Sequence, residues 1–374
     1  MRKSIDLLEQ AIARDAGFTE AYCLLAKVNL FSYRFVSREP AHLRAGKAAA
    51  EKAMQLAPNL PESHIALARY YYLGLQDYER TYAELAQVTS PGNRSEYVDF
   101  LALTERRMGR WVDAVRHSEQ AYELDPRNHF IAIALLESYL ALRQYEQAIR
   151  FADRALTELP PDDDIIHIYK ASALIGMGKL DEARMLLEQA PTRTPDGTAK
   201  LIQLAILARD LDRASELWAT FPPARRFEVL YEGEIAELRG DTEKAHSFYR
   251  DARQHYLKLL EDNPDDRELT SFLSAAEAGL GNKAEAFRLA RRAVELRPIF
   301  RDTYEAPAFA LTRAEIYAWM GEGQAALDLL EELVTIPGSV SYGSLRFDPV
   351  WDDIRGDARF QALMARVTQP PVYR

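Results

Sequence analysis

Short amphipathic segments follow one another along the chain, with small or apolar residues recurring at steps of three and four. This spacing places such residues on one face of an α-helix. Residues 109–126 read GRWVDAVRHSEQAYELDP, and residues 143–160 read RQYEQAIRFADRALTELP, with matching alanines and a closing proline. Before each of them stands another amphipathic segment that ends in a Gly or polar turn, as in EYVDFLALTERRMG. The pattern therefore predicts pairs of helices, each forming a helical hairpin.

Matching residues of the two segments lie 34 positions apart, as Ala114 does from Ala148 and Ala121 from Ala155. A hairpin of this size cannot bury its apolar face alone, so successive hairpins must stack, and small side chains at the alanine positions permit close contact. The repeat is strongest in 95–160, clear in 19–60, 164–191 and 267–333, and degenerate in 61–91 and 195–260.

This repeat resembles the tetratricopeptide repeat, whose units are paired antiparallel helices stacked into a right-handed superhelix. The resemblance implies an all-α fold, an α-α superhelix of about nine to ten hairpins. We expect the array to cover residues 1–337, starting inside a repeat because SIDLLEQAIARDAGF reads as a second helix without a first. We expect a C-terminal capping segment and tail in residues 338–374, in which Trp351, Ile354, Phe360 and Leu363 cover the last apolar face.

Two clusters of aromatic residues depart from the repeat pattern. Phe31, Tyr33 and Phe35 flank an insertion around residues 36–40, and they either pack under the longer link or contact a ligand. Tyr70, Tyr71 and Tyr72 are consecutive and cannot share one helix face, so at least one should point outward, and Tyr72 falls on the expected concave face.

Composition narrows the function classes. The 374 residues carry 47 Lys and Arg against 57 Asp and Glu, a formal charge of −10, which argues against nucleic-acid binding. No apolar run approaches the length of a membrane span, and Cys23 as the single cysteine leaves no internal disulfide. We expect a cytoplasmic protein without membrane insertion.

Motifs for catalysis or cofactor binding are missing. The seven histidines show no HExxH pattern, and GMGKLDEA at 176–183 has no preceding strand and reads as a hairpin turn. Asp162, Asp163 and Asp164 precede a helix, where carboxylates cap free backbone N–H groups. We expect no enzymatic activity, no cofactor and no metal.

The remaining candidate is the concave surface, which the first helix of each unit lines in the family that the repeat resembles. Family members that clamp a peptide's C-terminal carboxylate use a Lys/Asn/Lys/Arg constellation, which the expected surface lacks, whereas its aromatic and charged side chains suit an extended or helical peptide. The expected groove residues are Lys27, Arg69, Tyr72, Arg106, Phe130, Glu137, Tyr169, Gln203, Tyr231, Glu234, Phe272, Glu315 and Trp319.

The terminal stretch LRFDPVWDDIRGDARFQALM resembles segments that close tetratricopeptide arrays in bacterial multidomain signalling proteins. Such proteins carry adenylate or guanylate cyclase, Ser/Thr kinase or winged-helix regulator domains upstream. Three functions stay open: an interaction scaffold for a protein or peptide partner or an upstream domain of the same parent protein, a regulatory module of such a signalling protein, and a small-ligand sensor using the aromatic patch at Tyr72 and Tyr82.

Overall fold

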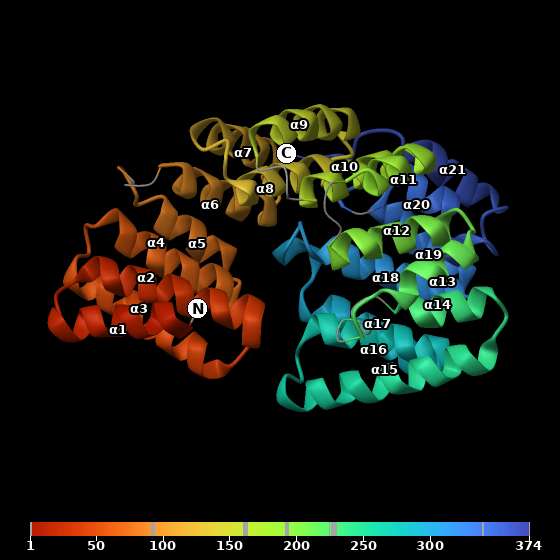
Figure 1. The fold of residues 1–374 in the computed structure, drawn as a ribbon, viewed down its shortest axis with the longest axis horizontal. Coiled ribbons are helices and arrows are strands. Elements are labelled where there is room, and N and C mark those ends of the chain that lie inside the picture. The colour runs from red at the N-terminus through yellow and green to blue at the C-terminus, as the bar shows by residue number, and fades with distance from the viewer. Residues whose placement is uncertain are drawn as a thin grey trace. The chain divides into compact units, whose positions relative to one another are not determined.

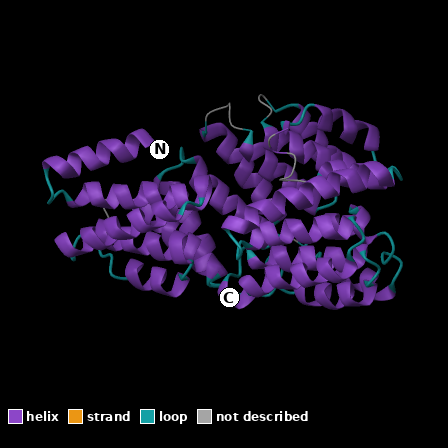
Figure 2. Ribbon diagram, turned by 90° about the horizontal axis from the view of Figure 1, so that it is seen from below, coloured by secondary structure: helices purple, strands orange, loops and turns teal. Residues whose placement is uncertain are grey.

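The fold is seen in a computed structural model that describes residues 2–90, 94–159, 164–190, 194–223, 225, 230–338 and 340–373. Helices joined by short loops make up this described part, and Figure 2 shows no strand in it. The expected all-α fold is therefore confirmed. The chain divides into two compact units, Met1–Asp125 and Pro126–Arg374.

The first unit contains one helix without a hairpin partner and then three helical hairpins, α2 with α3, α4 with α5 and α6 with α7. A π-helical turn follows the first helix of two hairpins, η1 after α2 and η2 after α4. The turn η1 lies at the insertion around residues 36–40 and lengthens the link there. The bounds of these elements are α1 (Arg2–Arg14), α2 (Thr19–Ser32), η1 (Tyr33–Ser37), α3 (Pro40–Leu56), α4 (Pro61–Arg69), η2 (Tyr70–Leu75), α5 (Tyr78–Leu85), α6 (Arg94–Arg107) and α7 (Trp111–Leu124).

The second unit begins with six hairpins along its described part (Figure 1). The helices of the first three are α8 (His129–Ala141), α9 (Tyr145–Glu158), α10 (Ile165–Gly176), α11 (Leu180–Glu188), α12 (Pro195–Leu207) and α13 (Leu211–Ala219). Those of the next three, with one short 3-10 turn, are α14 (Tyr231–Leu238), α15 (Thr242–Asp262), α16 (Arg267–Gly279), α17 (Lys283–Leu296), η4 (Ile299–Arg301), α18 (Ala306–Trp319) and α19 (Gly323–Leu333).

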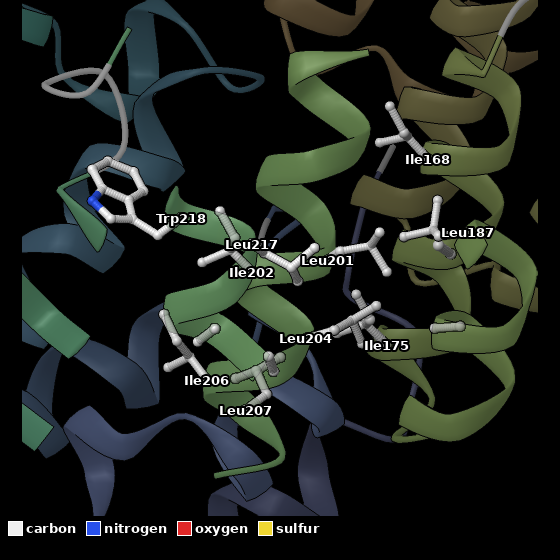
Figure 3. Close-up of a cluster of buried hydrophobic side chains, with 14 of the residues drawn as sticks. Ile168, Ile175, Leu187, Leu201, Ile202, Leu204, Ile206, Leu207, Leu217 and Trp218 are labelled. Carbon is white, nitrogen blue, oxygen red and sulfur yellow. The ribbon is translucent and has the colours of Figure 1, made fainter. Parts of the chain in front are cut away.

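Stacking of hairpins buries the small and apolar faces that the sequence pattern predicts. Ala114, Ala121, Ala148 and Ala155 are fully buried, which confirms the close helix contacts expected at these positions. Between α10 and α13 a larger cluster forms, in which Ile168, Leu187, Leu201, Leu217 and Trp218 meet (Figure 3). Burial of one such side chain stabilises the fold by about 1.5–3 kcal/mol, so contacts between neighbouring hairpins carry most of the stability.

The chain after α19 packs on the last hairpin. It contains α20 (Tyr342–Phe347), η5 (Pro349–Trp351) and α21 (Ala358–Arg366). Trp351, Phe360 and Leu363 are buried against α18 and α19, and Ile354 packs on the same cluster. The division into an array of residues 1–337 and a capping segment of residues 338–374 stays a prediction.

The capping prediction for the aspartates before α10 is wrong where it can be judged. Asp162 and Asp163 lie outside the described residues. Asp164 makes no side-chain cap on α10; its carboxylate is buried and accepts hydrogen bonds of 2.8 Å from both the backbone N–H and the hydroxyl of Thr194. It therefore fixes the start of α12, a contact between neighbouring hairpins.

Candidate interaction surfaces

In the first unit, two predicted groove residues share one carboxylate partner. Lys27 on α2 lies with its Nζ 2.6 Å from Oε1 of Glu96 on α6, and Arg69 on α4 donates to the same oxygen. Burial acts to raise the pKa of Glu96, but Arg69 and Lys27 outweigh it and hold that pKa below its ordinary value. The structure thus brings together charges from three consecutive first helices.

Tyr72 and Arg106, the other groove candidates of this unit, are both buried. The Tyr72 ring packs 5.2 Å from the Tyr78 ring and 5.3 Å from the Phe100 ring, and its hydroxyl accepts a hydrogen bond from Arg107. The prediction that Tyr72 faces the groove is therefore wrong, since its ring fills the core under η2. The same burial removes Tyr72 from the proposed ligand-sensing patch.

An exposed apolar stripe begins on α2 beside Lys27 and continues into η1. Leu24 and Phe31 are seven residues apart and lie along one face of α2, and Phe35 in η1 is 61% exposed. The Phe31 and Phe35 rings contact each other with centroids 4.7 Å apart. Packing under the longer link is therefore wrong for Phe35, and the stripe remains open to a partner.

In the second unit, one predicted groove residue of the first three hairpins is exposed, and the others form hydrogen bonds within the unit. Phe130 is 65% exposed at the start of α8. Tyr169 on α10 donates a 2.8 Å hydrogen bond to Glu137 on α8. Gln203 on α12 accepts a 3.0 Å hydrogen bond from Lys200, whose pKa desolvation lowers to about 8.

Phe272 on α16 contacts its own unit, because its ring stacks 5.6 Å from that of Tyr256 on α15. Trp319 on α18 donates a 2.7 Å hydrogen bond from Nε1 to Oε1 of Glu237 on α14. Its ring also lies 5.9 Å from that of Tyr249. Both aromatic candidates are thus engaged in contacts between hairpins.

Three acidic groups of the second unit, Glu234, Glu315 and Asp348, influence one another through their charges. Desolvation raises the pKa of Glu234 on α14 and of Glu315 on α18 to about 8, and the charge of Asp348 adds to both increases. Each carboxyl keeps some solvent contact, but the surrounding protein disfavours its ionised form. Tyr231 has a raised pKa from burial, with Glu234 and Asp348 contributing.

The sequence reasoning missed three charged residues of the second unit: Asp348, Arg143 and Arg209. Asp348 lies within the terminal stretch LRFDPVWDDIRGDARFQALM, which resembles array-closing segments. Arg143 and Arg209 occupy the turn between the two helices of their hairpins, where other hairpins carry glycine, as Gly178 shows. That exchange of arginine for glycine was a signal available in the sequence.

The described residues contain neither a cluster of metal ligands nor a helix that could span a membrane. No group of three or more His, Cys, Asp or Glu side chains in this part of the chain is arranged to hold a metal ion. Among the same residues, every helix is too short or too polar for a membrane span.

No protein-family model matches the chain. It is 25% identical over 249 residues to Hsp70-Hsp90 organizing protein 3 of Arabidopsis thaliana, covering 62% of the chain and 40% of that relative. It is also 25% identical over 226 residues to U-box domain-containing protein 70 of Oryza sativa subsp. japonica, covering 57% of the chain and 26% of that relative. The chain thus spans less than half the length of either relative.

Solved structures with similar folds include PilF of Pseudomonas aeruginosa and a dimer of human IFIT1. The PilF match has 16% identity and a TM-score of 0.44, and covers 64% of this chain and 99% of PilF. The IFIT1 match has 15% identity and a TM-score of 0.45, and covers 98% of this chain and 94% of IFIT1.

Proposed function

We propose that this chain, an array of tetratricopeptide-type helical hairpins, is a non-catalytic scaffold that binds a protein partner through its first unit. The observation that carries the proposal is the exposed stripe of Leu24, Phe31 and Phe35 beside the ion-paired Lys27. Contiguous exposed apolar surface rimmed by charge is typical of protein interaction sites.

The stripe defines the chemistry of the partner segment. Two contacting phenylalanine rings and a leucine on one helix face suit a peptide or helix that presents apolar side chains at helical spacing. Lys27 lies within one helical turn of Leu24 and Phe31 and is ion-paired with Glu96, which Arg69 also contacts. We therefore expect a polar rim with paired charges on this side of the stripe. The partner therefore anchors by burial of apolar groups and is aligned by charge.

Affinity capture with the whole 374-residue chain tests the proposal. Phe35→Ser removes the most exposed ring of the stripe, and Phe300→Ser is the matched control, because Phe300 is an 80% exposed phenylalanine of the second unit. We expect a partner captured by the wild type and by Phe300→Ser to bind Phe35→Ser at least about tenfold more weakly in calorimetry with the purified partner. Equal affinity of all three proteins would refute the assignment of the stripe.

The alternative, a regulatory module of a signalling protein, rests on the resemblance of the terminal stretch around Trp351 to array-closing segments. In that case the partner would be an upstream domain of the same parent protein. Sequencing of the gene upstream of Met1 distinguishes the two functions, because only the regulatory module requires an effector domain there. The partner implied by the name of the plant organizing protein is not transferred, since the expected groove lacks the carboxylate-clamping constellation.

A further inference from the structure

The turns between paired helices have one residue in the left-handed backbone region. At equivalent places in seven successive hairpins stand Gly109, Arg143, Gly178, Arg209, Gly240, Gly281 and Gly321, with φ between 56° and 80°. This conformation disfavours any side chain relative to glycine. Two arginines at glycine positions therefore require a compensating contact. Both contact the chain that follows α19, residues 334–338 and 340–373, called the C-terminal segment below.

Arg143, in the turn between α8 and α9, is buried and binds four backbone carbonyls. Its guanidinium lies 2.9 Å from the oxygens of Val334 and Ile336, and 3.5 and 3.4 Å from those of Val367 and Gln369. One side chain thus joins both ends of the C-terminal segment to the first hairpin of the second unit.

One backbone hydrogen bond and one side-chain hydrogen bond add to the attachment of the C-terminal segment at this turn. The N–H of Gly338 donates a 2.9 Å hydrogen bond to the carbonyl of Ala141. The side chain of Gln144 donates a 3.0 Å hydrogen bond to the hydroxyl of Tyr373. The last hydrogen-bonded part of the chain is therefore attached to the same turn.

At the next turn, between α10 and α11, the backbone of α20 packs directly against the backbone of the turn. Figure 1 shows these helices side by side. A Cβ at Gly343 would lie 1.7 Å from the carbonyl oxygen of Ile175 and 3.3 Å from the backbone nitrogen of Gly178. A Cβ at Gly178 would in turn lie 3.1 Å from the ring of Tyr342. Only glycine at 343 allows this approach.

The third turn, between α12 and α13, holds Arg209. Its guanidinium lies 2.8 and 2.7 Å from the two carboxylate oxygens of Asp352. Arg355 fixes this part of the segment, because it donates to the carbonyls of Leu345 and Asp348, each at 2.7 Å. The C-terminal segment thus runs along three successive turns of one edge of the second unit.

The geometry points to the C-terminal segment, residues 334–338 and 340–373, as a latch that closes the second unit on itself. It docks on Arg143, Gly178 and Arg209, and it releases these three turns without unfolding of the hairpins that carry them, while Trp351, Phe360 and Leu363 stay packed on α18 and α19. Closure also brings Asp348 toward Glu234 and Glu315, a repulsive contribution that the arginine contacts offset. The latch is a property of the chain by itself and does not depend on the proposed partner.

Hydrogen exchange of the whole 374-residue chain, resolved by peptide mass spectrometry, tests the latch. Gly343→Ala places a methyl group against Ile175, while alanine is the better helix former within α20 itself. Gly356→Ala is the matched control, because nothing lies within 4 Å of its Cβ. We expect Gly343→Ala to speed exchange in peptides covering 334–347 and 365–373 by at least about tenfold, with peptides of α12 and α13 unchanged.

Arg143→Gly is the second variant, chosen because glycine fits the left-handed turn better than arginine does. If Arg143 acts through its four carbonyl contacts, the same C-terminal peptides lose at least about tenfold in protection despite the relieved turn. Unchanged exchange in both Gly343→Ala and Arg143→Gly overturns the latch. An equal increase in α12 and α13 also overturns it, because the segment would then open only when the hairpins unfold.

Discussion

Glu315→Gln should remove part of the pH dependence of stability of this protein. Glu315 lies on α18, and desolvation, followed by the charges of Asp348 and Glu234, raises its pKa from 4.5 to about 8. Glutamine keeps the shape of the side chain and remains neutral at every pH. The variant therefore isolates the free energy of ionising one carboxyl in this environment.

The sign follows from the raised pKa. Below pH 4.5 the carboxyl is protonated in both folded and unfolded chains, so its full contribution to stability is present. Between pH 4.5 and about 8 the unfolded chain ionises first, and stability falls as pH rises through this window.

The size of the loss follows from the same pKa values. A rise of about 3.5 in pKa corresponds to about 5 kcal/mol at about 1.4 kcal/mol per pKa unit. Residual solvent contact of Glu315 and its coupling to Glu234 and Asp348 reduce this value. We expect a difference of about 2 kcal/mol between wild type and variant.

Urea denaturation followed by far-ultraviolet circular dichroism at pH 5.5 and pH 8.5 (roughly the two ends of the window) measures this difference. The free energy of unfolding of the wild type should fall more between the two pH values than that of Glu315→Gln. Glu261→Gln, at an exposed position of α15, is the control and should follow the wild type. Parallel pH profiles of wild type and Glu315→Gln would show that the interior ionises without a free-energy cost.

Two substitutions test the packing, and a third tests the backbone strain of a turn. Ala148→Leu overfills a fully buried helix contact and should lower the free energy of unfolding by about 1–3 kcal/mol in urea denaturation; an unchanged midpoint would contradict the assigned contact. Trp351→Ala empties the cap core, where Trp351 is 1% exposed, and should cost about 3–5 kcal/mol in a thermal melt, whereas Val372→Ala at an exposed site should not shift it. Gly281→Ala meets no neighbouring atom but has φ of 76°, so a loss of about 1 kcal/mol measures turn strain alone.

The sequence by itself determined the repeat and the hairpins. Ala114 and Ala148 occupy the same position of successive repeats, and both are buried. Each hairpin packs on the next hairpin along the chain, so the same small residue is required at this contact each time. The cap was predictable for a similar reason, since Trp351 and Phe360 are large apolar residues after the last hairpin with one apolar face to cover.

Only the tertiary structure decided which predicted groove residues are accessible. Tyr72 was placed on a surface by helical register, but its ring has Tyr78, Phe100 and Arg107 as neighbours. Register gives the direction of a side chain relative to its own helix. It does not give the packing that follows when a π-helical turn changes that direction, as η2 does here.

The contacts of the C-terminal segment also came only from the fold. Arg143 lies 191 residues before Val334 and Arg209 lies 143 before Asp352, and no periodicity links positions so far apart. The sequence displays arginine where the repeat favours glycine, which marks both turns as unusual. What those arginines bind is decided by the path of the second unit in space, because that path brings the chain after α19 back to the edge of α8, α10 and α12.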